Sequence, residues 1–248
     1  MRLYVLLGLA TFAAAPMPAQ KILKNTSEEL VLRWDFNEGS GGWLAGFTDY
    51  GLETADLQRV AEIRRLPEEV DSTRWGYYLQ SMNRSDDVFM YLKRPLSTEM
   101  GLQANTRYSV TIDVEFLSNE AEGCVGVGGP PAEAVTLKAG VSRVEPVPML
   151  IGDFVDINVD KGQQVTGGRD AGVIGHIGNG RACEDDGRPY VFLHRVYHHP
   201  ETVTSREDGT LWTLVGTDSG YEGLTGLYYY SIQITLRPLG PADVNQRL

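Results

Sequence analysis

The feature that most constrains this chain is an unbroken alternation of apolar and polar residues in TRYSVTIDVEF, residues 106–116. The apolar set is Tyr108, Val110, Ile112, Val114 and Phe116, and the polar set between them is Ser109, Thr111, Asp113 and Glu115. Because successive side chains of a strand point to opposite faces, the pattern predicts a strand with one buried and one solvated face. Strands of this kind belong to antiparallel sheets.

A second segment, LYYYSIQITL at residues 227–236, repeats the alternation. It predicts a closing strand with Tyr228 and Tyr230 in the core and Tyr229 facing outward. The preceding GTDSGYEG contains glycines that permit positive φ, so we expect it to be the tight turn into that strand.

The rest of the chain is rich in strand patterns that are separated by short turns such as NEGSGG, NRSDD, DKGQQ and REDGT. Strands are expected at residues 30–36, 76–82, 88–92, 134–139, 154–159, 172–177, 190–197 and 210–216. One stretch, 54–70, could form a short amphipathic helix, but it also alternates and a strand around 59–66 is preferred. Many short strands with closely spaced turns predict an all-β protein, an antiparallel β-sandwich of the jelly-roll type.

The N-terminus has the layout of a secretory signal peptide, with Arg2 before an apolar run from Leu3 to about Ala15. The run is too short to cross a bilayer as a helix, so no membrane span is expected. We predict a cleaved signal peptide at 1–19, a single β-sandwich domain at 20–238 and a flexible C-terminal tail at 239–248. The protein is therefore expected to be secreted or periplasmic.

The net charge limits the classes of binding partner, and the cysteine content predicts a disulfide. The formal net charge of −11 disfavours nucleic acid and anionic membrane surfaces, and it is compatible with a neutral polysaccharide or a cationic ligand. The two cysteines, Cys124 and Cys183, are expected to form a disulfide in an exported protein. Two separate buried thiols are the alternative.

Two phrases carry a resemblance to a known family. LRWDFNEGSGGW, residues 32–43, opens the domain, and QANTRY, residues 103–108, leads into the alternating strand. Together they resemble the galactose-binding-like jelly rolls, which include many carbohydrate-binding modules, over roughly residues 30–116. The resemblance implies an architecture first, because the phrases are typical of the fold and not of one ligand. It also implies a structural calcium ion without placing it, and it suggests a bacterial secreted protein.

Sugar binding needs flat aromatic faces beside polar side chains that fix hydroxyl groups. The aromatic residues that we predict to bind a ligand are Trp43, Tyr50, Trp75 and Tyr221. For each of them, packing in the core or in a hairpin is the alternative.

Calcium needs several hard oxygen ligands at close range. The predicted ligands come from the opening loop and from the loop before the last strand: Asp35, Asn37, Asp218 and Glu222. The alternative is that these are solvated carboxylates of turns. His194 and His198 share one strand face and could bind zinc or copper, but no third ligand is apparent.

No residue is predicted to be catalytic, because the chain has no GxSxG nucleophile elbow. Asp113 and Glu115 lie about 7 Å apart on one strand face, which would suit a glycosidase if that face lined a groove. TLKAGV, residues 136–141, is similar to a strand of jelly-roll alginate lyases, but the arginine-bearing and Gln-x-His motifs of those enzymes are missing.

Three functions are compatible with these features. The preferred one is a secreted, non-catalytic β-sandwich that binds a polysaccharide or another cell-surface glycan or ligand. The alternatives are a polysaccharide-active hydrolase or lyase on a jelly-roll sheet, and a structural or interaction domain with no small ligand.

Overall fold

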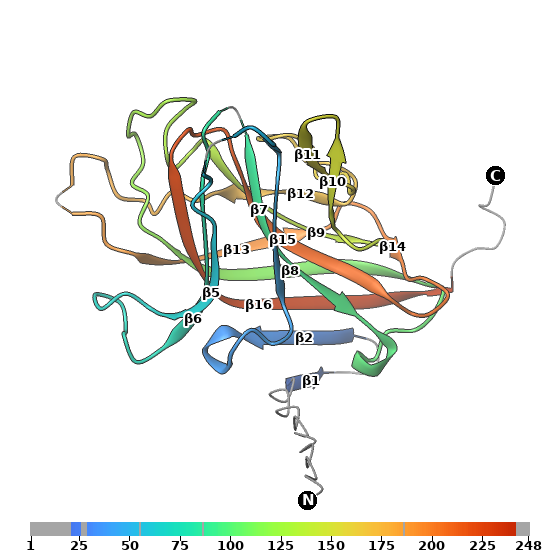
Figure 1. Ribbon diagram of the computed structural model, residues 1–248. Coiled ribbons are helices and arrows are strands. Elements are labelled where there is room, and N and C mark those ends of the chain that lie inside the picture. Colours follow the sequence, from blue (N-terminus) through green and yellow to red (C-terminus); the bar gives the residue numbers. More distant parts are fainter. Residues whose placement is uncertain (1–20, 26–28, 55, 86, 186, 242–248) are drawn as a thin grey trace, which may run out of the picture.

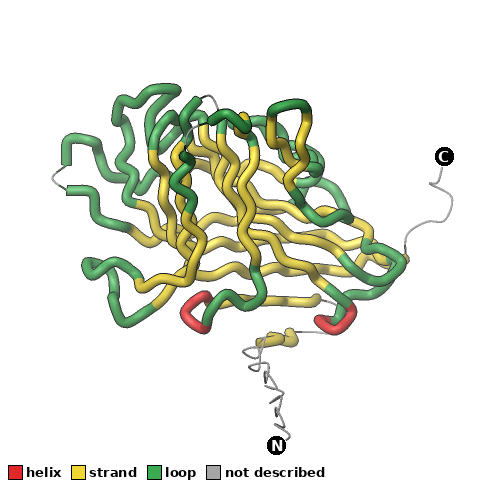
Figure 2. Tube along the Cα trace, in the orientation of Figure 1, coloured by secondary structure: helices red, strands yellow, loops and turns green. Residues whose placement is uncertain are grey.

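The structure of the chain is a computed structural model (Figure 1). It describes residues 21–25, 29–54, 56–85, 87–185 and 187–241. Within these residues the helical content is limited to two 3-10 turns, η1 (Phe36–Glu38) and η2 (Thr98–Met100), and strands dominate (Figure 2). None of these residues forms a helix long and apolar enough to span a bilayer. The predicted all-β, antiparallel fold is confirmed.

The largest sheet has eight strands. They are β1 (Lys21–Asn25), β2 (Glu29–Asp35), β5 (Val60–Arg65), β6 (Trp75–Met82), β8 (Thr106–Ser118), β13 (Val191–His198), β14 (Val203–Thr204) and β16 (Leu224–Pro241). β16 is its central strand: it pairs with β6 and β2 along one edge and with β8 along the other. β8 pairs in turn with β13 and β14.

Two further sheets complete the sandwich. A five-stranded sheet has the order β12 (Ala171–His176), β9 (Val135–Ser142), β15 (Leu211–Ser219), β7 (Val88–Leu96) and β3 (Leu44–Thr48). A small sheet has the order β10 (Pro148–Ile151), β11 (Phe154–Ile157) and β4 (Tyr50–Gly51). In Figure 1 the small sheet lies on the opposite side of the five-stranded sheet from β16 and β2.

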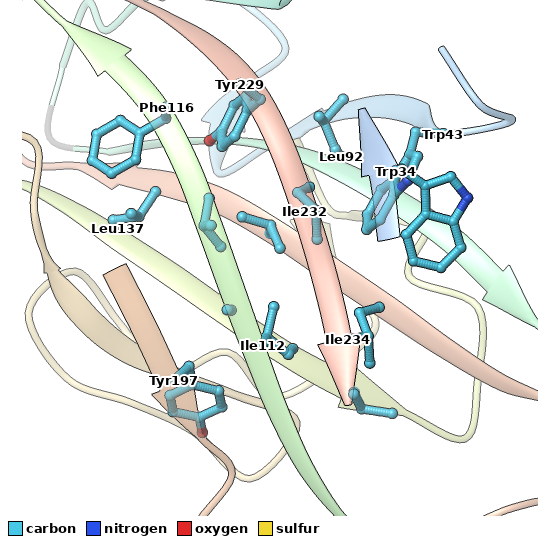
Figure 3. Close-up of a cluster of buried hydrophobic side chains, with 14 of the residues drawn as sticks. Trp34, Trp43, Leu92, Ile112, Phe116, Leu137, Tyr197, Tyr229, Ile232 and Ile234 are labelled. Atoms are coloured by element: carbon cyan, nitrogen blue, oxygen red, sulfur yellow. The ribbon is translucent and has the colours of Figure 1, made fainter. Parts of the chain in front are cut away.

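The main hydrophobic core fills the space between the large and the five-stranded sheets (Figure 3). The alternating strand β8 contributes its apolar set, including Ile112 and Phe116, as its sequence predicts. A second cluster, with Phe89 and Ile157 among its members, packs the small sheet and the segment after it onto the other face of the five-stranded sheet. That sheet is therefore covered on both faces, whereas the large sheet has only one fully covered face.

The three tyrosines of β16 do not follow the predicted alternation. Tyr229, expected to face outward, is fully buried in the main core (Figure 3), while Tyr228 and Tyr230 belong to a separate cluster on the other face of the large sheet. The cause is a register shift against β8 between Tyr229 and Ser231, which leaves Tyr230 as an extra residue. A bulge of one residue reverses the faces on either side of it.

Among the other predictions, one strand is confirmed and one turn is wrong. The ambiguous stretch 54–70 contains strand β5 and no helix. β15 continues to Ser219, so Asp218 lies in a strand and not in the expected turn. β16 continues to Pro241, beyond the predicted domain end at 238, and residues 242–248 of the predicted tail lie outside the described residues, as does the predicted signal peptide at 1–19.

The predicted disulfide is present. Cys124 and Cys183 are bonded, with their Cα atoms 5.1 Å apart and 59 residues apart in sequence. Backbone hydrogen bonds from Glu122 N–H to Arg181 O and from Cys183 N–H to Glu122 O hold the two loops side by side. In the chain-entropy description, closing a loop of this length stabilises the fold by about 4 kcal/mol.

Candidate functional site

Five charged side chains gather on the covered face of the five-stranded sheet. Asp218 of β15 and Lys138 of β9 project from the sheet itself, and the side chains of both are fully buried. Lys161 comes from the loop after β11, Asp49 from the junction of β3 and β4, and Asp87 from the residue before β7. We call these five residues the charged cluster.

Two ammonium groups hold the cluster together. Lys161 Nζ lies 2.6 Å from Asp49 Oδ2 and 2.7 Å from Asp218 Oδ2. Lys138 Nζ lies 2.7 Å from the same Asp218 oxygen and also donates to the backbone carbonyls of Lys161 and Thr166. Charges without solvent contact persist only when they are paired and hydrogen-bonded, and this cluster meets that condition.

The loop that delivers Lys161 is shaped by its own neighbours. The Asp160 carboxylate accepts hydrogen bonds from the backbone N–H groups of Gly162 and Arg169, and these two bonds lower the pKa of Asp160. Gly162 has φ of +67°, and a Cβ at this position would lie 2.3 Å from the carbonyl oxygen of Thr166. A glycine is thus required directly after Lys161 for the chain to turn.

Burial changes the pKa values in the cluster. Desolvation, followed by the hydrogen bond to Asp218 and the charge of that residue, raises the pKa of Asp87 to about 9. Burial alone would lower the pKa of Lys161, but the attraction of Asp218 and Asp49 outweighs it and the pKa lies above its usual value. With Asp87 neutral at pH 7, the two ammonium groups balance the carboxylates of Asp49 and Asp218.

Three of these carboxyl groups are close enough to hold a metal ion. Asp49, Asp87 and Asp218 each offer an oxygen within 4.8 Å of the others, and the buried Oδ1 of Asp49 has no hydrogen-bond partner. A cavity of about 480 Å³ opens beside them, with Asp49, Asp87 and Lys161 in its wall. Yet a calcium ion does not fit the set as it stands, because the Lys161 ammonium already contacts two of the three carboxylates.

The residues predicted to bind calcium are separated in the structure. Asp35 accepts the backbone N–H of Asn37 and caps η1, and Asn37 Oδ1 accepts the backbone N–H of Trp75. Glu222 lies in the turn before β16, with its N–H on the carbonyl of Val127. Only Asp218 belongs to the triad, and the role of the opening loop and of the loop before the last strand as calcium sites stays a prediction.

The outward face of the large sheet is the second candidate region, and we call it the open face. Its members come from β2, β8, β13 and β16: Arg33, Asp113, Glu115, Phe192, His194, Ser231 and Gln233. Arg33 Nη2 donates to Glu115 Oε2 at 2.7 Å, and Ser231 Oγ donates to the same oxygen. His194 Nε2 lies 3.3 Å from Asp113 Oδ1. The polar side chains therefore form pairs across the strands, and all of them except the buried Ser231 stay in contact with solvent.

Aromatic rings adjoin this polar row. Phe192 is 44% exposed and packs edge-on against Tyr230, with ring centroids 5.3 Å apart. It lies two residues before His194 on the same face of β13, so the Cα atoms of the two residues are about 7 Å apart. Tyr78 and Tyr228 extend the aromatic cluster behind it, and Arg64 lies over the Tyr78 ring.

Of the four aromatic residues predicted to bind a ligand, one is in the core. Trp43 is 1% exposed and packs against Trp34 and Phe36, so its ring offers no face to a ligand (Figure 3). Trp75 is 36% exposed, with the Arg65 guanidinium over its ring. Tyr50 on β4 and Tyr221 in the last turn are half-buried. These residues stand on different elements and do not share a surface with Phe192.

Sequence reasoning missed several members of both regions. Phe192 could have been found from the alternation of β13, whose even positions are all exposed. Lys138 gives a signal too, because it is a lysine inside a strand whose residues are otherwise apolar or small. Asp49, Asp87 and Lys161 have no local signal, since only tertiary pairing brings them together.

No protein-family model and no curated protein sequence matches this chain. Its fold is similar to solved β-sandwich structures, including carbohydrate-binding modules. A family 61 carbohydrate-binding module solved with β-1,4-galactotriose has a TM-score of 0.37 and 10% identity, over 80% of this chain and 92% of that one. An adhesin domain (K3) of Lys-gingipain from Porphyromonas gingivalis has a TM-score of 0.37 and 11% identity, over 82% and 98%. A cyclase from Fischerella sp. has a TM-score of 0.36 and 12% identity, over 83% and 89%. None of these likenesses identifies a ligand for this chain.

Proposed function

We propose that this protein binds a carbohydrate on the open face of its large sheet, without catalysis. The observation that supports the proposal is the exposed ring of Phe192 beside a row of solvent-accessible hydrogen-bonding side chains. A pyranose has apolar CH faces that stack on a flat ring, and hydroxyl groups that need donors and acceptors at its rim.

The polar side chains of the open face can both donate hydrogen bonds to a sugar hydroxyl and accept them from it. Asp113 and Glu115 supply acceptors, and Arg33, His194 and Gln233 supply donors. Arg33 and Glu115 are each 37% exposed at the side chain, so part of each group stays free to bond a ligand. Because their mutual pairs hold these side chains in place before binding, little conformational entropy is lost on association.

The ionisation of Glu115 favours binding over hydrolysis. Partial burial would raise its pKa, but hydrogen bonds from Ser231 and Arg33 outweigh that effect and the pKa lies below its usual value. Glycoside hydrolysis needs one protonated carboxyl group to donate to the leaving oxygen. A carboxylate held ionised by an arginine is a good hydrogen-bond acceptor and a poor acid.

Trp75 is the second aromatic residue that we include in the proposal. Of the four predicted ligand-binding residues it has the most exposed ring. It begins β6, next to Arg74, whose guanidinium lies 4.3 Å from the centroid of the Tyr230 ring at the edge of the open face. The Trp75 ring lies on the other face of β6 from Tyr78, so a glycan of several units that starts on Phe192 would have to pass over Arg74 at the edge of the sheet to reach it.

Co-sedimentation with a panel of insoluble polysaccharides, followed by calorimetric titration with soluble oligosaccharides, tests the proposal. We expect at least one polysaccharide to retain the protein and Phe192→Ala to weaken that binding by about tenfold or more. Leu150→Ala, which removes a 63% exposed side chain from β10 in the small sheet, is the matched control and should bind normally. Retention by no polysaccharide, or unchanged affinity in Phe192→Ala, would reject the proposal.

A further inference from the structure

The charged cluster contains an ammonium group among three carboxyl groups that lie close enough to share a metal ion. Lys161 Nζ contacts two of the three carboxylates that lie close enough to share an ion. Those carboxylates belong to chain segments far apart in sequence, Asp49 between β3 and β4 and Asp218 on β15. Calcium ions in proteins bind carboxylate and carbonyl oxygens of the kinds that surround Lys161 Nζ.

From this geometry we infer that the Lys161 ammonium replaces a structural metal ion, and that removing its side chain would turn the Asp49–Asp87–Asp218 triad into a divalent-cation site. The Lys161 side chain then supplies the positive charge that a metal ion would supply. The small sheet and the loop after it stay attached to the five-stranded sheet without calcium. This inference does not depend on the proposed carbohydrate ligand.

The hydrogen bonds of Lys161 support this assignment. An ammonium group has three protons, and they can be assigned to Asp49 Oδ2 at 2.6 Å, Asp218 Oδ2 at 2.7 Å and the Gly162 carbonyl at 3.2 Å. Two carboxylates and a backbone carbonyl are also the kinds of oxygen that calcium prefers. The group is therefore coordinated as a small cation would be, and its side chain is 5% exposed.

The surroundings would accept an ion once the ammonium is gone. Asp49 keeps a buried Oδ1 that has no hydrogen-bond partner in the structure, and the Asp87 carboxyl group is hydrogen-bonded to Asp218. Lys138 would remain on Asp218, so three carboxyl groups would face one ammonium group. The cavity of about 480 Å³, whose wall includes Asp49, Asp87 and Lys161, provides a path by which an ion can reach them.

Thermal unfolding in EDTA and in millimolar calcium chloride tests the inference. The wild-type Tm should be the same in both solutions, because no ion is needed at the cluster. Lys161→Ala should have a lower Tm in EDTA, and calcium should raise that Tm by about 5 °C in a saturable manner, as expected for a ligand that binds only the folded state. Calorimetric titration of Lys161→Ala with calcium should show one bound ion, and wild type should show none at this cluster.

Two variants separate an ion site from a general effect of calcium. The Lys161 ammonium lies over the Phe89 ring, and Lys161→Met fills that space with an uncharged side chain, so it should lose stability without rescue by calcium. Lys161→Ala combined with Asp87→Asn lacks one ligand and should lose most of the calcium response. If Lys161→Ala folds only when calcium is present, that result also supports the inference.

Two results would overturn it. The first is a wild-type Tm that falls in EDTA and no longer does so in Asp87→Asn, which would mean that the native cluster already holds an ion. The second is a Lys161→Ala protein that binds no calcium in the titration. If Lys161→Ala does not fold in either solution, Lys161→Gly and the wild-type EDTA comparison decide the question by the same criteria.

Discussion

The covered face of the five-stranded sheet and the open face of the large sheet use the same kinds of ion pair in opposite surroundings. On the open face, Arg33 and Glu115 are 2.7 Å apart and each side chain is 37% exposed. On the covered face, Lys138 and Asp218 are also 2.7 Å apart, and neither is exposed. When one partner of the exposed pair is removed, water can solvate the other, and little stability is lost. When one partner of the buried pair is removed, the other is left as an unpaired buried charge, and much stability is lost.

The largest difference between the faces is expected when one carboxylate is removed from each. Asp218→Ala leaves the Lys138 and Lys161 ammonium groups buried without their shared partner, and we expect the free energy of unfolding to fall by about 5 kcal/mol. Glu115→Ala should lower it by less than about 1 kcal/mol. Urea unfolding at pH 7 measures both. Similar losses of stability in the two variants would show that burial does not make the Lys138–Asp218 pair more important than the Arg33–Glu115 pair.

A second comparison concerns the two tryptophans that the sequence placed together as ligand candidates. Trp43→Ala opens a cavity between Trp34 and Phe36, and we expect a loss of about 4 kcal/mol. Trp75→Ala, at the exposed start of β6, should cost about 1 kcal/mol or less and should weaken polysaccharide binding instead. If Trp75→Ala were as destabilising as Trp43→Ala, its ring would be structural and its place in the proposed site would be lost.

The difference between Trp43 and Trp75 shows where sequence patterns reach their limit. The alternation of β8 predicts its buried face correctly, because every residue from Tyr108 to Phe116 follows the same period. The same rule fails at Tyr228–Tyr230, where one bulged residue reverses the faces. A bulge has no strong mark in the sequence itself, since it is set by pairing with the neighbouring strand.

Sequence patterns predict the candidate sites less well than they predict the strands. The sequence predicts Asp218 to be a metal-binding carboxylate in a turn, yet it lies in β15 and pairs with two lysines. The carboxylate was recognisable from sequence, but its partners Asp49 and Lys161 are more than 50 residues away in the chain. In contrast, Asp113 and Glu115 were placed on a polar strand face from period alone, and that placement is confirmed.

The covered face should also differ from the open face in its response to pH. Asp87 has a folded-state pKa of about 9, against a usual value of 3.8. Between these values the unfolded chain loses the proton that the folded chain retains, so this group makes the free energy of unfolding fall as pH rises from about 4 to about 9. The groups facing Asp87 are Asp218, Lys161 and Asp49, and burial raises the pKa of Asp49 as well.

Asp87→Asn removes this proton and keeps the shape of the side chain. We expect the variant to be about 2 kcal/mol more stable than wild type at pH 8, with the advantage shrinking toward pH 4. Urea unfolding at several pH values measures it, and Asp113→Asn on the open face is the matched control with little expected change. Parallel pH profiles for Asp87→Asn and wild type would contradict the assignment of a raised pKa to Asp87.

The smallest expected effect on stability is on the open face itself. Arg33→Ala removes one of two donors to Glu115 Oε2 and should change the free energy of unfolding by about 0.5 kcal/mol. The pKa of Glu115 should rise toward its usual value, because the guanidinium no longer favours the carboxylate, and Ser231→Ala should act in the same direction. An NMR titration of the Glu115 carboxyl carbon measures this shift.

Salt gives the same pair an independent check. Exposed charges are screened within about 8 Å at physiological ionic strength, so salt should reduce the effect of Arg33→Ala on the pKa of Glu115. The buried pair of Lys138 and Asp218 has no solvent contact, and salt should leave the cost of Asp218→Ala nearly unchanged. If salt weakened both pairs equally, water would have to reach the charged cluster. The Lys138–Asp218 pair would then not be buried, and the two faces would not differ in the way described above.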